Sequence, residues 1–197
     1  MHRLSYLLIL ITLLCSACSS GNTRFYLLNS VQDDELTETS KETRIVEISR
    51  LQLPQYLERP QIVTRSSNNR LVLAEFAQWA GNLRKNMMRT LAENISRQLS
   101  TQMVTFTPNH AIEPDVRIEL EVIQFERLAS GKVSLVSRWR LFDKNGTLFK
   151  IHTSRLSSAQ ITEHADYDAT VSAMSLLLGE LSDQIAKVIL NQPIGLP

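Results

Sequence analysis

The strongest structural signal in this chain is an alternation of apolar and charged residues between Val116 and Val122. Successive side chains of a strand point to opposite faces of a sheet, so the alternation predicts a strand with one buried face and one solvated face. The apolar phase shifts between Ile123 and Phe125, and this shift predicts a β-bulge. A fold built on such a strand needs other elements to cover its apolar face.

Turn residues divide the neighbouring segments into further strands. Ser130-Gly131 precedes the apolar segment 132–142, and Asn145-Gly146, a strong hairpin signal, precedes segment 148–156. We therefore predict a three-stranded antiparallel meander. A second hairpin is predicted over residues 61–76, around the polar turn Ser66-Ser67-Asn68-Asn69.

Two longer segments have a helical period. From Asn82, a suitable N-cap, apolar residues recur at every fourth position through Leu99. A second amphipathic helix is predicted from about Asp166 to Leu190, with an apolar stripe broad enough for deep burial or for contact with another subunit. Together these elements predict an α+β fold: one antiparallel sheet with two long helices packed on one face, in a single domain.

The amino terminus has the features of a bacterial lipoprotein signal. Residues 4–14 are apolar and span roughly 16 Å as a helix, well short of the roughly 30 Å hydrocarbon core. They are followed by Cys15-Ser16-Ala17-Cys18, so we predict a signal peptide over residues 1–17 and lipidation of Cys18. The alternative is an ordinary cleaved signal that leaves Cys18 as a free thiol. Ser19, rather than Asp, favours sorting of the lipoprotein to the outer membrane, facing the periplasm.

Between the anchor and the domain we predict a polar tether. Residues 18–43 are mostly polar, apart from a candidate first strand at Phe25-Tyr26-Leu27-Leu28, and the folded domain is predicted over residues 44–197. Removal of residues 1–17 takes away one of the 21 basic residues and no acid, leaving 20 basic and 20 acidic residues. A neutral domain gives no reason to expect a nucleic-acid partner.

Sequence motifs of catalysis and of metal binding are missing. The chain has no Gly-x-Ser-x-Gly elbow, no His-Glu-x-x-His motif and no glycine-rich phosphate loop. The best candidate is His164-Ala165-Asp166-Tyr167-Asp168, but these carboxylates stand where a helix is predicted to begin, so we interpret them as capping residues. We predict that the protein is not an enzyme and holds no cofactor or metal beyond the covalent lipid.

A central segment is similar to a known family. It comprises Leu53-Pro54-Gln55-Tyr56-Leu57-Glu58-Arg59-Pro60-Gln61-Ile62-Val63-Thr64-Arg65, then Leu73-Ala74-Glu75-Phe76, Trp79-Ala80 and Leu91-Ala92-Glu93-Asn94. This pattern resembles the auxiliary lipoprotein family of ABC-type transport systems. The chain departs from it at Gly81-Asn82, where the family usually has Glu-Pro. The resemblance implies a homo-oligomeric docking component at the outer membrane, with a periplasm-spanning MCE-domain (mammalian cell entry) protein as partner and lipid as cargo.

Five residues of this segment are candidates for the partner interface: Tyr56, Leu57, Arg59, Arg65 and Trp79. Tyr, Trp and Arg are the residue types that dominate protein interfaces. Structural roles are the alternative, since Trp79 can cover the start of a helix and Arg59 can pair with Glu58 or Glu75. Two other functions remain open: a carrier that holds acyl chains between sheet and helices, and a periplasmic hydrolase that uses His164 with Asp166 or Asp168.

Overall fold

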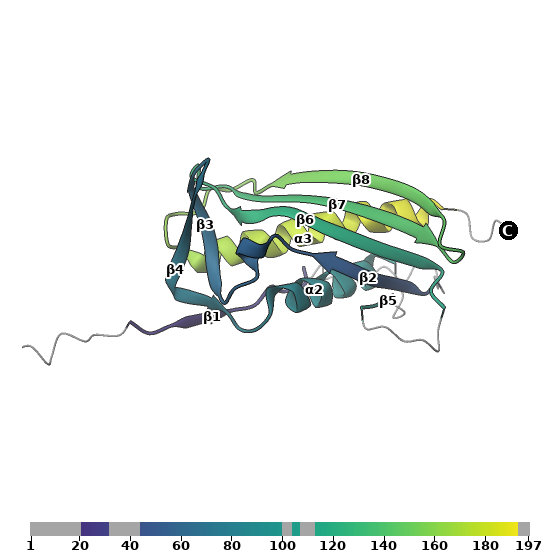
Figure 1. Cartoon of the computed structure of the whole chain (residues 1–197), viewed down its shortest axis with the longest axis horizontal. Helices are drawn as coiled ribbons and strands as arrows, with labels where there is room; N and C mark the ends of the chain where they lie inside the picture. Colours follow the sequence, from purple (N-terminus) through teal and green to yellow (C-terminus); the bar gives the residue numbers. More distant parts are fainter. Residues whose placement is uncertain (1–20, 32–43, 100–103, 107–112, 193–197) are drawn as a thin grey trace, which may run out of the picture.

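Two long helices lie along one face of a mixed β-sheet in the computed structural model of the chain (Figure 1). The structure describes residues 21–31, 44–99, 104–106 and 113–192. The helices are α2 (Leu83–Gln98) and α3 (Tyr167–Leu190), and they pack against each other as well as against the sheet. The predicted single-domain α+β class is confirmed.

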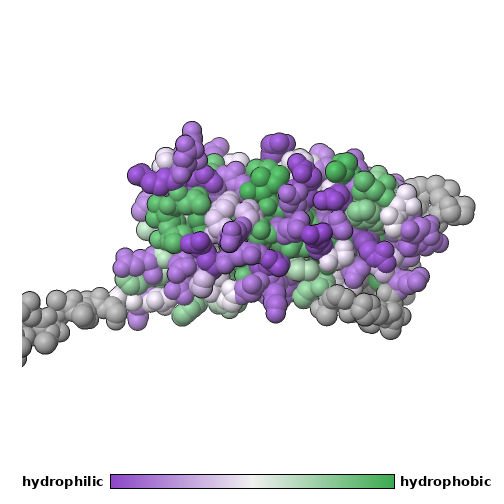
Figure 2. All heavy atoms as spheres, in the orientation of Figure 1, coloured by the Kyte–Doolittle hydropathy of each residue, from purple (hydrophilic) through white to green (hydrophobic). Residues whose placement is uncertain are grey.

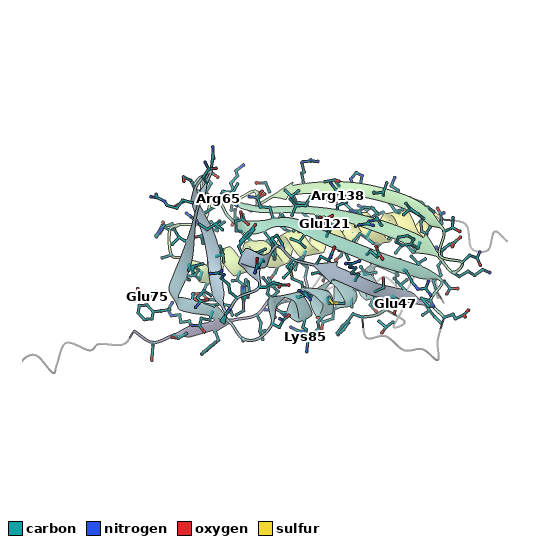
Figure 3. The ribbon with its side chains drawn as sticks, in the orientation of Figure 1. Glu47, Arg65, Glu75, Lys85, Glu121 and Arg138 are labelled. Atoms are coloured by element: carbon teal, nitrogen blue, oxygen red, sulfur yellow. The ribbon has the colours of Figure 1, made fainter. Side chains whose placement is uncertain are left out.

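The centre of the sheet is the predicted antiparallel meander. It consists of β6 (Val116–Arg127), β7 (Val133–Asp143) and β8 (Leu148–Ser157). The register of β6 against β7 shifts between Val122 and Gln124, as expected for a bulge at the apolar phase change. The outer face of the sheet carries ion pairs between neighbouring strands, including Arg138 with Glu121 at 3.3 Å (Figure 3).

The other edge of β6 is shared by two strands that follow each other in the chain. β2 (Val46–Gln52) runs parallel to the first half of β6, and β3 (Gln61–Ser67) pairs with its end, where Thr64 lies opposite Arg127. Between them the chain leaves the sheet in a short 3-10 turn, η1 (Gln55–Leu57). This interruption follows from the flanking prolines, because proline lacks the N–H that a ladder of hydrogen bonds requires.

The predicted strand directions are wrong for part of the sheet. β3 and β4 (Arg70–Trp79) form the expected antiparallel hairpin. However, β1 (Arg24–Tyr26) is parallel to β4, and β2 is parallel to both β6 and β5 (Val104–Thr105). The hairpin and α2 separate β2 from β6 in the chain, and long connections of this kind allow parallel pairing. Periodicity reports which face a residue occupies but not the direction of the neighbouring strand.

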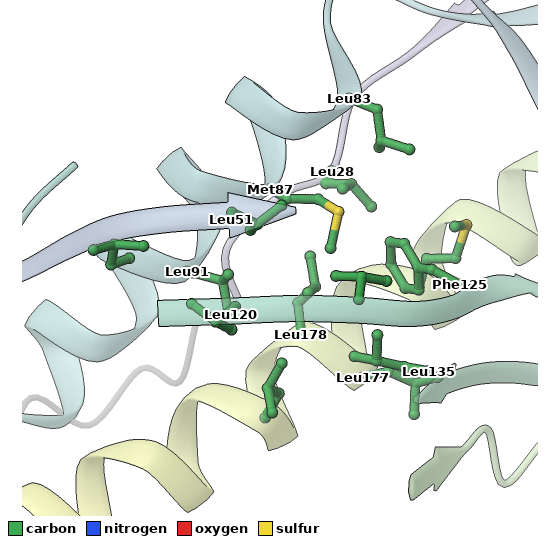
Figure 4. Close-up of a cluster of buried hydrophobic side chains, with 14 of the residues drawn as sticks. Leu28, Leu51, Leu83, Met87, Leu91, Leu120, Phe125, Leu135, Leu177 and Leu178 are labelled. Carbon is green, nitrogen blue, oxygen red and sulfur yellow. The ribbon is translucent and has the colours of Figure 1, made fainter. Parts of the chain in front are cut away.

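Both predicted helices begin at the expected caps. The side chain of Asn82 accepts a hydrogen bond from the Lys85 N–H at 3.0 Å, and that of Asp166 accepts one from the Ala169 N–H at 2.9 Å. Their apolar stripes meet the inner face of the sheet in one core (Figure 4). Within the described residues, none of the helices combines the length and apolar character needed to cross a membrane.

An N-terminal strap, residues 26–31, lies between the two helices. Leu28 is fully buried, and its backbone N–H donates to the Asn86 side chain at 2.7 Å (Figure 4). Further along, the Val31 N–H donates to Asn94 at 3.0 Å. On the α3 side, a Cβ added to Gly179 would come within 2.6 Å of the Val31 side chain, so this position needs glycine for the strap to pack closely.

The strap changes the predicted domain boundary. We expected residues 18–43 to form a tether apart from a possible first strand, and the domain to begin at residue 44. The structure has a strand at Arg24–Tyr26, which overlaps the candidate strand only at Phe25 and Tyr26, and it buries Tyr26 and Leu28 in the core. The predicted signal peptide, Cys18 and residues 32–43 lie outside the described residues.

The neighbouring residues Leu27 and Leu28 provide a matched test of the strap. Leu28 is fully buried whereas Leu27 is 46% exposed. We expect Leu28→Ala to lower the free energy of unfolding by about 2–5 kcal/mol, because it leaves a cavity between the helices. Leu27→Ala should change it by less than about 0.5 kcal/mol. Urea denaturation of both variants checks this, and equal stabilities would show that the strap does not belong to the cooperative core.

Candidate partner-binding site

The segment that carries the family resemblance begins with η1, the turn that connects β2 to β3 beside β6. η1 is closed by a hydrogen bond from the Leu57 N–H to the Pro54 carbonyl at 2.9 Å. The chain rejoins the hairpin where the Trp79 N–H donates to the Pro60 carbonyl at 2.7 Å. Leu57 points into the core and is 3% exposed, so it holds the turn against the domain.

A buried carboxylate, Glu126, fastens the turn to the sheet. Its side chain is fully buried and accepts hydrogen bonds from the Tyr56 hydroxyl at 2.7 Å and from Arg65 Nε at 2.8 Å. The Phe125 N–H and the Gln124 side chain also donate to it, each at 3.1 Å. A buried charge is tolerated only when it is paired and hydrogen-bonded, so these donors belong together as one structural unit.

Two of the side chains that donate to Glu126 have raised pKa values. Burial, followed by the hydrogen bond to Glu126, raises the pKa of Tyr56 well above its ordinary value. The hydrogen bond to Glu126 likewise raises the pKa of Arg65. Both shifts favour the protonated forms that donate to the carboxylate, so the network is intact at neutral pH.

A pocket of about 250 Å³ opens beside η1, between the turn and the start of α2. It is lined by Leu53, Glu58, Arg59, Pro60, Gly81, Asn82, Leu83 and Arg84. Glu58 forms an ion pair with Arg84 across the pocket. The Nε atom of Arg59 is buried and has no hydrogen-bond partner in the structure. The pocket therefore combines charged and apolar walls.

The departure from the family pattern at Gly81-Asn82 lies in this pocket. Gly81 adopts a φ of 148°, in the region that favours glycine, and Asn82 caps α2 in place of the usual proline. The helix thus begins normally despite the different residues. Because both residues line the pocket, this departure from the family pattern affects the pocket wall and leaves the fold unchanged.

The structure separates the five predicted interface residues into three groups. Leu57 and Trp79 are 3% and 5% exposed and serve the core. Tyr56 and Arg65 hold Glu126, and Arg59 lines the pocket. Among the described residues, Arg59 forms neither of the alternative ion pairs, with Glu58 or with Glu75; Glu58 pairs with Arg84.

Two groups of important polar residues were missed in the sequence. Glu126 was not identified from the sequence: the bulge places Phe125 in the core and Glu126 on the opposite face of the sheet, where Tyr56 and Arg65 donate hydrogen bonds to it. Asn86, Thr90 and Asn94 are buried and bind the backbone of the strap. Their spacing of four residues, beside the apolar stripe of α2, was the available signal.

Two of the candidate hydrolase residues, Asp166 and Asp168, lie at the start of α3. Asp166 caps α3, and Asp168 lies exposed in its first turn, 3.9 Å from Arg24. Ala165 between His164 and Asp166 has a positive φ of 66°, as the chain turns into the helix. In the described part of the chain, no group of three or more His, Cys, Asp or Glu side chains is arranged to hold a metal ion.

Comparison with known proteins gives consistent results. A family model described as "ABC-type transport auxiliary lipoprotein component" matches residues 26–186. The intermembrane transport lipoprotein PqiC of Escherichia coli (strain K12) is 27% identical over 190 residues, covering 95% of this chain and 98% of that protein. PqiC of Shigella flexneri matches to the same extent.

Solved structures share the architecture. The crystal structure of an uncharacterized protein matches with a TM-score of 0.71 and 22% identity, covering 86% of this chain and 99% of that one. The structure of a Xanthomonas campestris protein matches with a TM-score of 0.66 and 12% identity, covering 86% of this chain and 93% of that one. At these identities the likeness establishes the fold alone.

Tyr56→Phe tests the network around Glu126. At neutral pH we expect the variant to be less stable by about 1.5–3 kcal/mol, the usual value of a hydrogen bond to a charged group. The pKa of Tyr56 is raised in the folded state, so its stabilising contribution is complete below the unfolded value of about 10 and is lost as the pH rises above it. The stability difference between wild type and variant should therefore shrink above pH ~10 in urea titrations. A difference that stays constant to higher pH would contradict the assignment.

Proposed function

This chain belongs to the family of ABC-type transport auxiliary lipoprotein components, and from that membership we propose that it is the outer-membrane docking component of an MCE-type intermembrane lipid transport system. The family consists of transport auxiliary lipoproteins and not of enzymes. The near full-length match to PqiC, an intermembrane transport lipoprotein, supports transport between membranes as the process. The MCE-domain partner is inferred from the family resemblance of the segment around η1.

In this proposal Cys18 carries the lipid that holds the domain at the outer membrane. Burial of acyl chains contributes about 0.8 kcal/mol per CH₂, so more than one chain makes attachment durable. Ser19, next to the anchor, favours the outer membrane over retention at the inner membrane. A domain confined to the membrane surface meets its partner at high effective concentration.

The pocket beside η1 is the observation that carries the docking proposal. One wall of it, formed by Leu53, Glu58, Arg59 and Pro60, belongs to the segment with the strongest family resemblance, and the Glu126 network fastens that segment to the sheet. Preorganised surfaces lose little conformational entropy on binding, so a rigid turn is a favourable docking element. Arg59 lines the pocket, and a guanidinium there suits a carboxylate or a main-chain carbonyl of the partner.

A lipid-carrying function is favoured less by the same geometry. Pockets that enclose drug-sized ligands are typically about 300–1,000 Å³ and mainly apolar. The pocket beside η1 measures about 250 Å³ and is lined partly by Glu58, Arg59 and Arg84. The inner face of the sheet and both helices meet in a continuous core of buried side chains. These features suit a protein contact better than an acyl chain.

We also propose that the protein acts as a homo-oligomer. Most of the broad apolar stripe on α3 is core, including Leu177 and Leu178. Leu176 and Leu190 remain 56% and 43% exposed on the same helix, which leaves apolar surface for a neighbouring subunit. Sedimentation of the purified lipoprotein in detergent measures the number of subunits directly.

Affinity capture from mildly solubilised envelopes tests the docking proposal. We expect full-length protein to recover an MCE-domain protein, identified by mass spectrometry. Arg59→Ala should weaken this complex about tenfold, the loss of roughly 1.4 kcal/mol, because it removes the cationic wall of the pocket. Arg155→Ala, an exposed arginine on β8, is the matched control and should bind like wild type.

The anchor is tested in the same cells. Cys18→Ala should move the protein out of the outer-membrane fraction and reduce recovery of the partner. Recovery of an MCE-domain protein that Arg59→Ala leaves unchanged would exclude the pocket but not the docking role. Failure of wild type to recover any MCE-domain protein would contradict the role itself.

A further inference from the structure

The end of the domain that carries β1 exposes several large apolar side chains. Phe25 is 65% exposed, Leu27 46% and Phe76 41%, and we call these three residues the β1-end apolar surface. β1 pairs with β4 so that Phe25 lies opposite Gln78, and Phe76 is two residues before Gln78 on the same face. Figure 2 shows further apolar side chains gathered over the β3–β4 hairpin at this end of the molecule.

This surface lies within a few residues of the predicted anchor. Gly21 contacts Phe76, since a Cβ added to Gly21 would be 2.9 Å from the Phe76 ring. Only three Cα–Cα steps separate Cys18 from Gly21, and at 3.8 Å per step they span at most about 11 Å. An acyl group on Cys18 would therefore bring the membrane surface next to Phe76 whatever path those residues follow.

We propose that the β1-end apolar surface contacts the lipid surface to which Cys18 is anchored, and so fixes the orientation of the domain on the membrane. The proposal rests on the lipidation of Cys18 in the proposed function. Apolar side chains at such a surface enter the boundary between headgroups and acyl chains.

The short connection favours lipid over a second copy of the chain as the occupant. A stable dimer interface buries about 1,200–2,000 Å² in total, far more than three partly exposed side chains supply. A membrane contact needs no such area, because the covalent anchor already holds the two surfaces together. Its contribution is orientation: the β1 end faces the membrane, and the C-terminal end of α3, at the opposite end of the molecule, points away (Figure 1).

Tryptophan quenching in vesicles tests this contact. Full-length lipidated protein is reconstituted into vesicles of phosphatidylethanolamine and phosphatidylglycerol, with or without brominated acyl chains. Phe25→Trp places a probe on the β1-end apolar surface. Ile151→Trp is the matched control, because Ile151 is 56% exposed on β8. Wild type, with buried Trp79 and Trp139, supplies the baseline.

We expect the emission added by Phe25→Trp to fall by about half in brominated vesicles, as for a side chain roughly 5–10 Å into the interface, while Ile151→Trp stays unchanged. Equal quenching of both probes, or of neither, would overturn the proposal. A Phe25→Trp emission already blue-shifted in detergent and insensitive to brominated lipid would assign the surface to a second copy.

Flotation of wild type with the vesicles separates the two levels of inference. If wild type does not float with the vesicles, the lipid anchor on Cys18 is excluded. Both the lipid contact and the membrane-anchored form of the proposed function are then overturned. Flotation without selective quenching overturns the lipid contact and leaves the docking role intact. Affinity capture of the partner is a separate measurement that tests the docking role itself.

Discussion

The arrangement of the whole domain depends on how the N-terminal strap satisfies its backbone between two helices. An extended segment in a core exposes N–H and carbonyl groups that must find partners. Here the partners are side chains of α2: Asn86 binds both polar groups of Leu28, Thr90 binds its carbonyl, and Asn94 binds the N–H of Val31. Gly179 supplies the space on α3. The helices therefore pack around the strap, and residues 26–31, predicted to be part of a tether, belong to the core.

A second buried polar unit determines what the family segment can present to a partner. Glu126 requires Tyr56 and Arg65 as hydrogen-bond donors, so these two residues serve the fold even though their types suit an interface. Arg59, one of the other members of the segment, lines the pocket. The network that engages Tyr56 also fastens the turn that forms part of the pocket wall. In the proposed function, docking and stability would be divided between neighbouring residues of one turn.

The strap and the turn connect the proposed membrane contact with the proposed partner site. β1 pairs with β4, β4 forms the hairpin with β3, and β3 continues directly from η1. The three strands belong to one sheet with a continuous core, and η1 packs against that core through Leu57. A domain oriented on the membrane through its β1 end would therefore present the pocket at a defined angle. The ion pairs on the outer sheet face add little to this rigidity, because exposed pairs contribute only about 0–1 kcal/mol.

The sequence by itself determined the elements whose signals are local. Alternation in β6, the Asn145-Gly146 turn and the caps Asn82 and Asp166 specify strands, hairpins and helices, because side-chain direction and hydrogen bonding within a few residues decide them. Only the tertiary structure decided that β2 runs parallel to β6, that residues 26–31 enter the core and that Glu126 accepts hydrogen bonds from Tyr56 and Arg65. Each of these depends on contacts between residues about 60 to 70 positions apart, where a buried polar group takes whichever donor the fold brings near.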